Sequence, residues 1–336
     1  MGGCHRCAGD CGRQGRAAYP HEAARHHDLP GRLALLGAMA AVALPGAVAC
    51  DGTTAAPSGT GSPRPTSAAS STLASGLYQV NGHHLYLTCA GTGQPTVMLE
   101  AGLSADHNAW EPVNELAPLV GARVCAYDRY GLGQSDIPAS TPTRTIDQVV
   151  DDLHALIEVA RIPGPLVLAG HSMGGLIVRE FARRYPSQVV GMLLFDSAPD
   201  DWDVYTGTET FTEGGESIDV QAAAAELRLS DSLGSMPLIV VQAGDDSEVQ
   251  SGWAPGKSDF QSYWSSRQLA LAKASTNSIF VIAPGVTHDL LPQQPPLLSP
   301  TAMKLVVDAV HGGTPLPACG QTQLPNTGAT CLSKSP

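Results

Sequence analysis

From residue 76 onward, short apolar runs alternate with stretches whose apolar residues recur at helical spacing. Residues 146–161 predict a helix, because their apolar side chains repeat with a helical period and Thr145 and Gln148 form a capping-box pair. Asn81-Gly82, between two apolar segments, predicts a β-hairpin over residues 76–89. Further strands are expected at 96–100, 122–127, 166–169, 189–195, 238–242 and 278–283, and further helices at 174–185 and near 301–310. This alternation predicts an α/β fold with a mostly parallel sheet.

The chain begins with a different pattern. Residues 1–32 are polar, and residues 33–49 form an uncharged apolar run that follows Arg32 and ends at Cys50. A positive flank, an apolar run and small residues at its end are typical of a secretory signal, and the run is short for a transmembrane span. We therefore expect export.

The residues around Cys50 resemble a bacterial lipobox, Gly-Ala-Val-Ala-Cys over 46–50. That resemblance implies cleavage before Cys50 and a lipid on its sulfur. Residues 51–75, rich in Gly, Ser, Thr, Pro and Ala, fit a disordered tether for an anchored domain. The alternative is ordinary signal cleavage after an Ala, with Cys50 incidental. The expected organisation is a leader and signal over 1–50, the tether, a domain over 76–311 and a tail over 312–336.

Composition and charge narrow the class of protein. The chain is 43% hydrophobic and 15% charged, which is globular, and its net charge is −12. Because the first 49 residues carry five Arg, the remainder is more acidic than the whole, which argues against nucleic acid as a partner. Cys4, Cys7 and Cys11 lie in a polar leader with no fold to hold ligands in place, so we expect no metal site there.

The sequence Gly-His-Ser-Met-Gly over residues 170–174 lies between a predicted strand and a predicted helix. In that setting Gly-x-Ser-x-Gly forms a sharp turn that exposes the serine hydroxyl, with glycines where a side chain would collide. The following helix also directs its positive N-terminal end at the site. We predict that Ser172 is a nucleophile.

Four blocks together resemble the α/β-hydrolase superfamily over about residues 77–311. They are Leu-Glu-Ala-Gly-Leu at 99–103, Tyr-Asp-Arg-Tyr-Gly-Leu-Gly-Gln-Ser-Asp at 127–136, the serine turn at 170–175, and Gly-Val-Thr-His at 285–288. The resemblance implies a mostly parallel eight-stranded sheet with helices on both faces. It also implies a short cap at about 199–236 that leaves a fairly open cleft, and chemistry without a cofactor.

A serine needs a base to take its proton. The family's base follows the last strand, which identifies His288; His311 is the fallback, while His171 is expected to support the oxyanion loop. The sequence offers two candidates for the acid that orients this base. Asp246 (or its neighbour Asp245) follows the strand at 238–242, where the family usually carries the acid, but its spacing is off by one residue. Asp196 ends the strand at 189–195, where some members carry the acid, and it is favoured by a small margin.

The oxyanion hole requires two backbone N–H groups. The resemblance assigns these to Met173, after the serine, and Leu103, after Gly102. Asp128 and Arg129 are interpreted as structural, tying their loop to its neighbours through an ion pair.

The segment expected to form the cap carries Trp202, Tyr205 and Phe211, which either line an acyl or aryl pocket or pack the cap. Cys319 and Cys331 flank a Gly/Pro/Thr-rich stretch and are expected to form a disulfide in an oxidising compartment. The family's strand order makes a second bridge between Cys89 and Cys125 possible; the alternative is two buried thiols.

These features predict an exported, lipid-anchored serine hydrolase that cleaves a small-molecule carboxylic ester or related acyl bond through an acyl-enzyme. Membrane contact is expected only through the anchor. Alternatives are an aminopeptidase of the proline-iminopeptidase type, a metal-free haloperoxidase-like enzyme and a non-catalytic surface binding module. A dehalogenase is disfavoured because it would need Asp in place of Ser172.

Overall fold

The computed structural model describes residues 75–229, 232–289 and 291–332. The predicted leader, the lipobox with Cys50 and nearly all of the tether lie outside the described residues. No helix in the described ranges is long and apolar enough to cross a membrane.

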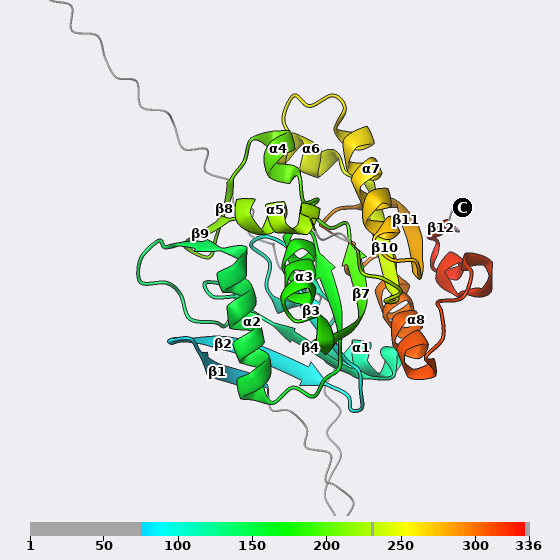
Figure 1. Cartoon of the computed structure of the whole chain (residues 1–336), viewed down its shortest axis with the longest axis horizontal. Helices are drawn as coiled ribbons and strands as arrows, with labels where there is room; N and C mark the ends of the chain where they lie inside the picture. Colours follow the sequence, from blue (N-terminus) through cyan, green and yellow to red (C-terminus); the bar gives the residue numbers. More distant parts are fainter. Residues whose placement is uncertain (1–74, 230–231, 290, 333–336) are drawn as a thin grey trace, which may run out of the picture. The chain divides into compact units, whose positions relative to one another are not determined.

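A nine-stranded sheet forms the centre of the domain (Figure 1). Its strands are β1 (Gly76–Val80), β2 (His83–Ala90), β3 (Thr96–Glu100), β4 (Arg123–Tyr127), β6 (Leu166–His171), β7 (Val189–Phe195), β10 (Leu238–Asp245), β11 (Ser278–Thr287) and β12 (Thr330–Leu332). They lie in the order β1-β2-β4-β3-β6-β7-β10-β11-β12. The strands from β4 to β11 run parallel, while β1–β2, β2–β4 and β11–β12 are antiparallel pairs. The predicted hairpin and each predicted strand are present.

Helices cover both faces of the sheet, as predicted (Figure 1). They are α1 (Val113–Val120), α2 (Ile146–Ala160), α3 (Met173–Arg184), α4 (Trp202–Thr206), α5 (Gln221–Leu229), α6 (Ser247–Trp253), α7 (Phe260–Lys273) and α8 (Leu298–Gly312). Alternate residues of a strand point to opposite faces. Leu166 and Leu168 therefore join α2, α3 and α7 in one core, while Val167 and Ala169 join α1 and α8 in the other. The predicted capping box starts α2.

The prediction of eight strands was wrong, because part of the expected tail adds a ninth. β12 pairs antiparallel with β11, and the Cys319–Cys331 disulfide closes the loop that leads into it. An exposed strand edge presents unpaired backbone groups, and the tail pairs with residues 280–282 of β11 at this edge. The second bridge, Cys89–Cys125, joins residues that lie directly opposite each other on β2 and β4.

The expected cap is a small substructure of its own. A second sheet, in the order β5-β9-β8, joins β8 (Thr210–Glu213) and β9 (Glu216–Asp219) of the cap to β5 (Thr143–Thr145). α4 and α5 lie on either side of this hairpin in sequence. The cap is thereby attached to the loop that precedes α2 as well as to β7, from which it continues.

Candidate active site

The carboxyl ends of the parallel strands meet at one edge of the sheet, where open α/β sheets place their sites. The segments that follow β3, β6, β7, β10 and β11 all reach this edge. They carry residues 101–103, Ser172, Asp196, Asp246 and His288.

Ser172 occupies the predicted strand–turn–helix between β6 and α3. Its backbone is strained, with φ 52° and ψ −123°, a conformation that non-glycine residues rarely adopt. A Cβ added to Gly174 would lie 2.5 Å from the Glu100 carbonyl oxygen, and one added to Gly170 would lie 2.5 Å from the Gly174 carbonyl oxygen. Both glycines are therefore required by close backbone approach.

Backbone hydrogen bonds tie this turn to the end of β7. The Ser172 N–H donates to the Phe195 carbonyl at 3.1 Å, and the Ser172 carbonyl accepts from Ala198 at 2.9 Å. Because Asp196 lies between those two partners, its position relative to Ser172 is set by the backbone.

His288 directly follows β11, and its Nδ1 lies 2.6 Å from Asp196 Oδ2. The other oxygen, Asp196 Oδ1, accepts from the Trp264 indole N–H at 2.9 Å and the Ala243 amide at 3.1 Å. Burial acts to raise the pKa of Asp196, but the hydrogen bond and charge of His288 outweigh it and leave the pKa below its ordinary value. Asp196 is thus a buried carboxylate that orients the imidazole. His311, the fallback base, instead contacts the Gln94 carbonyl.

Asp246, the other candidate acid, is buried beside Asp196 rather than on the far side of His288. Side-chain oxygens of the two aspartates and a ring nitrogen of His288 all lie within 4.8 Å of one another. Asp246 Oδ2 accepts from the Gln261 amide at 3.0 Å, whereas Oδ1 has no hydrogen-bond donor among the described residues. Burial, with Asp196 nearby, raises the pKa of Asp246 to about 9. At neutral pH Asp246 is therefore a neutral acid whose proton can bridge to Asp196. Asp245 is exposed and caps Ser247.

His171 is held as a neutral side chain. Its Nε2 lies 2.9 Å from the His288 carbonyl oxygen, and so acts as the donor. Burial and the neighbouring His288 lower the pKa of His171 to about 3. Its Nδ1 faces Gly102, where an added Cβ would lie 2.9 Å away. His171 therefore packs between the base and the loop at 101–103, in agreement with its expected supporting role.

Two backbone amides are positioned as candidates for an oxyanion hole. Met173 is the first residue of α3, and the first N–H groups of a helix have no partner within it. Leu103 follows Gly102, whose added Cβ would lie 3.3 Å from Ser172 Cβ. Both residues thus lie close to Ser172, and their role in an oxyanion hole stays a prediction.

Asp128 and Arg129 do not pair with each other. Arg129 bonds Glu100 at 2.6 Å and Glu213, in the cap hairpin, at 2.8 Å. Their structural interpretation holds, with partners that the sequence did not indicate. Glu213 was missed, because an acidic residue before a Gly-Gly turn carries no signal of a distant buried partner.

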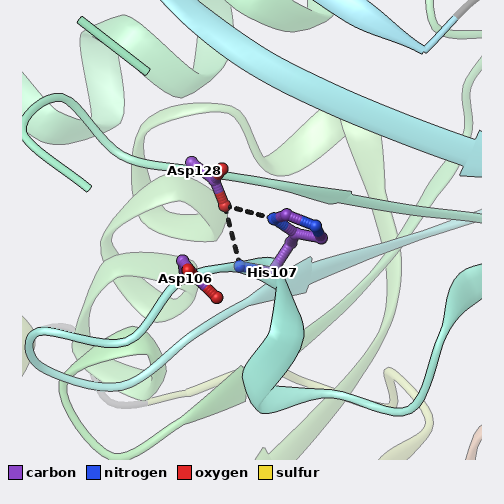
Figure 2. Close-up of side chains that lie close together, drawn as sticks. All are labelled: Asp106, His107 and Asp128. Atoms are coloured by element: carbon purple, nitrogen blue, oxygen red, sulfur yellow. Dashed lines mark hydrogen bonds and ion pairs between the residues drawn. The ribbon is translucent and has the colours of Figure 1, made fainter. Parts of the chain in front are cut away.

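A cluster of Asp106, His107 and Asp128 lies near the loop after β3 (Figure 2). Asp128 Oδ1 accepts from the His107 ring at 2.7 Å and from the His107 amide at 2.8 Å, and Asp128 Oδ2 accepts from the Gln134 amide. Asp106 caps Asn108. These carboxylates already hold backbone N–H groups, so the cluster functions as a loop brace rather than a ligand set.

The cap aromatics pack against one another. Trp202 is buried edge-on against Phe260 and Trp264, Phe211 is buried, and Tyr205 stacks on Tyr263 with ring centroids 3.6 Å apart. Trp264 in turn lies edge-on to His288. Ser172 is only 2% exposed and His288 only 3%. α7 therefore contacts the site through Trp264, and little of Ser172 or His288 is exposed; the fairly open cleft stays a prediction.

Comparison with known proteins supports this class of fold. The family described as "Serine aminopeptidase, S33" matches residues 111–206. The uncharacterized protein YqjL of Bacillus subtilis is 27% identical over 212 residues, which are 59% of this chain and 82% of that protein. A proline iminopeptidase of Saccharolobus solfataricus is 28% identical over 35% of this chain, and an AB hydrolase superfamily protein of Gibberella zeae is 37% identical over 31% of it. These two matches span 38% and 33% of the relatives' own lengths.

Among solved structures, a thermophilic esterase from Thermogutta terrifontis aligns with a TM-score of 0.50 and 21% identity, covering 71% of this chain and 99% of that one. At that identity the likeness concerns the fold. The sheet order, the strained serine turn and this match define the α/β-hydrolase fold. The family match and the relatives support the α/β-hydrolase superfamily.

Proposed function

We propose that this protein is an exported serine hydrolase that cleaves a carboxylic ester, with Ser172 as nucleophile, His288 as base and Asp196 as acid. One observation carries the proposal: a buried 2.6 Å hydrogen bond joins His288 Nδ1 to Asp196, and backbone hydrogen bonds hold Asp196 next to the strained turn at Ser172. A charged acceptor on Nδ1 favours the tautomer whose Nε2 is free to take a proton.

In the proposed reaction His288 Nε2 takes the Ser172 hydroxyl proton as Oγ attacks the substrate carbonyl. Asp196 stabilises the imidazolium that forms. The N–H groups of Leu103 and Met173 stabilise the oxyanion, assisted by the N-terminal end of α3. His288 then gives its proton to the leaving alcohol, and water releases the acid from the acyl-enzyme by the same steps.

The hydroxyl of Ser172 is the first part of this scheme to test. We expect a fluorophosphonate probe to label the wild-type protein and not Ser172→Ala. Ser197→Ala is the matched control, because Ser197 is also buried and packs against Gly175 in the same turn. Labelling that persists in Ser172→Ala, or no labelling of the wild type, would refute the proposed nucleophile.

An ester is proposed as substrate rather than a peptide. Ser172 and His288 are nearly buried and the Trp264 ring lies edge-on to His288, and these surroundings suit a neutral acyl group more than a charged amino terminus. An aminopeptidase is the second candidate, supported by the description of the matching family and by the proline iminopeptidase relative. A panel of p-nitrophenyl esters of rising chain length, alongside proline p-nitroanilide, decides between them. Faster turnover of the anilide than of every ester would replace the ester by the peptide.

We also propose export with lipidation of Cys50 as the only membrane contact. Support comes from the four cysteines of the described ranges, which are all paired in disulfides, as is usual in oxidising compartments. Incorporation of labelled palmitate by the full chain, lost in Cys50→Ala, is the expected result. Equal incorporation by Cys50→Ala would refute the anchor.

A further inference from the structure

We infer that Glu213, in the cap hairpin, is a positioning residue for the oxyanion hole, and that it acts through Arg129 on the peptide that carries the Leu103 N–H. The inference rests on the proposed function, since it assigns Leu103 to that hole. Nothing in the sequence resemblance points to Glu213, which lies 84 positions beyond Arg129 in the chain.

Arg129 holds the backbone on the near side of Leu103. Its Nη1 donates to the Ala101 carbonyl at 2.7 Å, and its Nη2 donates to the Gly102 carbonyl at 2.6 Å. The Gly102 carbonyl and the Leu103 N–H belong to one planar trans peptide unit, in which the two groups point in opposite directions. Fixing the carbonyl oxygen on Arg129 therefore fixes the direction of the N–H. A charged donor on the carbonyl also polarises the peptide and makes its N–H a stronger donor.

Glu213 completes the arrangement from the other side of Leu103. Its Oε1 accepts from Arg129 Nε and its Oε2 from Arg129 Nη2, both at 2.8 Å, so the pair is bidentate. The same Oε2 accepts from the Ser104 amide at 2.8 Å. The oxyanion loop is thus held immediately before Leu103 through Arg129 and immediately after it by Glu213 itself.

The two carboxylates around Arg129 have different tasks. Glu100 bonds Nη1, the nitrogen that reaches Ala101, and also accepts from the Tyr127 hydroxyl at 2.5 Å. Glu213 bonds Nη2, the nitrogen that reaches Gly102. Loss of the Glu213 charge would leave Arg129 paired with Glu100 while releasing the end of the guanidinium that orients the Leu103 peptide.

The hairpin that carries Glu213 is docked closely on the Arg129 loop. A Cβ added to Gly131 would lie 2.3 Å from the Gly214 carbonyl oxygen, and both glycines have positive φ, 86° and 53°. Only glycines permit this approach. Arg129 and Glu213 are both nearly fully buried, where a bidentate ion pair holds its geometry and is poorly screened. The cap therefore contributes to the catalytic geometry.

The test compares Glu213→Gln with Glu216→Gln. Glu216 lies on the other side of the same Gly-Gly turn, is equally buried, and pairs with Arg144 rather than with the oxyanion loop. Removing one oxyanion-hole donor outright costs about 10²–10³ in kcat, so a misaligned donor is expected to cost about 10- to 100-fold. We expect Glu213→Gln to lose that much kcat on a p-nitrophenyl ester while KM stays within about threefold.

Phenylboronic acid, which forms a tetrahedral adduct with a nucleophilic serine, is expected to bind Glu213→Gln more weakly by a similar factor. Glu216→Gln is expected to keep both kcat and boronate affinity within about twofold. If Glu213→Gln does not fold, as judged by thermal melting, Glu213→Asp is measured in its place, since it keeps the charge and shortens the reach.

Equal losses of kcat in the Glu213 and Glu216 variants would overturn the inference, as would a change confined to KM. Failure of the proposed function is distinguishable, because the wild type would then not be labelled by fluorophosphonate. Labelling of Glu213→Gln at the wild-type rate, with Ser172→Ala unlabelled, would reject the inference alone.

Discussion

Replacing Asp196 by Asn tests the proposed triad most directly. In the structure Oδ1 of Asp196 accepts from two donors, the Trp264 indole and the Ala243 amide, while Oδ2 accepts from His288. An asparagine keeps its oxygen toward the two donors and presents its NH₂ group to His288. His288 Nδ1 must then accept, the ring proton moves to Nε2, and the base can no longer take a proton from Ser172.

The expected magnitude follows from that tautomer change. In the trypsin-like triad the same aspartate-to-asparagine change lowers kcat by about 10⁴. Since each factor of ten corresponds to about 1.4 kcal/mol, the loss is about 5 kcal/mol of transition-state stabilisation. The assay is kcat on a p-nitrophenyl ester near neutral pH, with thermal melting to confirm that the variant is folded.

Asp246→Asn is the matched control in this experiment. Asp246 is a neutral acid at neutral pH, because burial and Asp196 raise its pKa to about 9. An amide in its place still donates toward Asp196 and accepts from Gln261. We expect kcat within about threefold of wild type. A loss as large as that of Asp196→Asn, or equal small losses from both, would refute the assignment of Asp196 as the acid.

Three further outcomes are expected. Folding raises the pKa of Asp246 to about 9, so between its ordinary pKa and that value the folded state holds a proton that the unfolded state has lost, and wild-type stability falls as pH rises through this window. Denaturant melts from pH 5 to 9 should show a flatter dependence of unfolding free energy on pH in Asp246→Asn than in the wild type. Parallel pH dependences in the two proteins would contradict the buried neutral acid. In Gly174→Ala the new Cβ would lie 2.5 Å from the Glu100 carbonyl oxygen, so the variant should lose about 3 kcal/mol of unfolding free energy and should not be labelled by fluorophosphonate. Unchanged stability and labelling would show that the turn accommodates a side chain at this position. Cys331→Ser should lower the unfolding free energy by about 3 kcal/mol in urea, and reduction of the wild type, which also opens the Cys89–Cys125 bridge, should cost at least as much.

The elements of the fold were largely predictable because their signals are local. The apolar period of residues 146–160, the capping box at Thr145 and the turn at Asn81-Gly82 each depend on neighbours within a few positions. The ninth strand was not predictable in this way. β12 has three residues and exists because the disulfide loop after Cys319 brings it to the free edge of β11.

The cap aromatics likewise combine a local signal that the sequence shows with contacts that it does not show. Trp202 and Phe211 were visible as apolar positions, but whether they line a pocket or pack depends on α7, which lies far along the chain. In the structure Trp202 packs against Phe260 and Trp264 of α7, and Phe211 is buried.

For the candidate site, the sequence by itself indicated Ser172 and its flanking glycines, because a tight turn between a strand and a helix constrains the residues within it, and the family resemblance indicated His288 after the last strand. The sequence did not decide whether Asp196 or Asp246 is the acid, since both follow strands that end at the same edge of the sheet. Only the tertiary structure decided which carboxylate bonds His288 and which is a neighbour that stays protonated. It also brought Glu213 to Arg129 across 84 positions, because side chains distant in sequence meet only when the cap docks on the sheet.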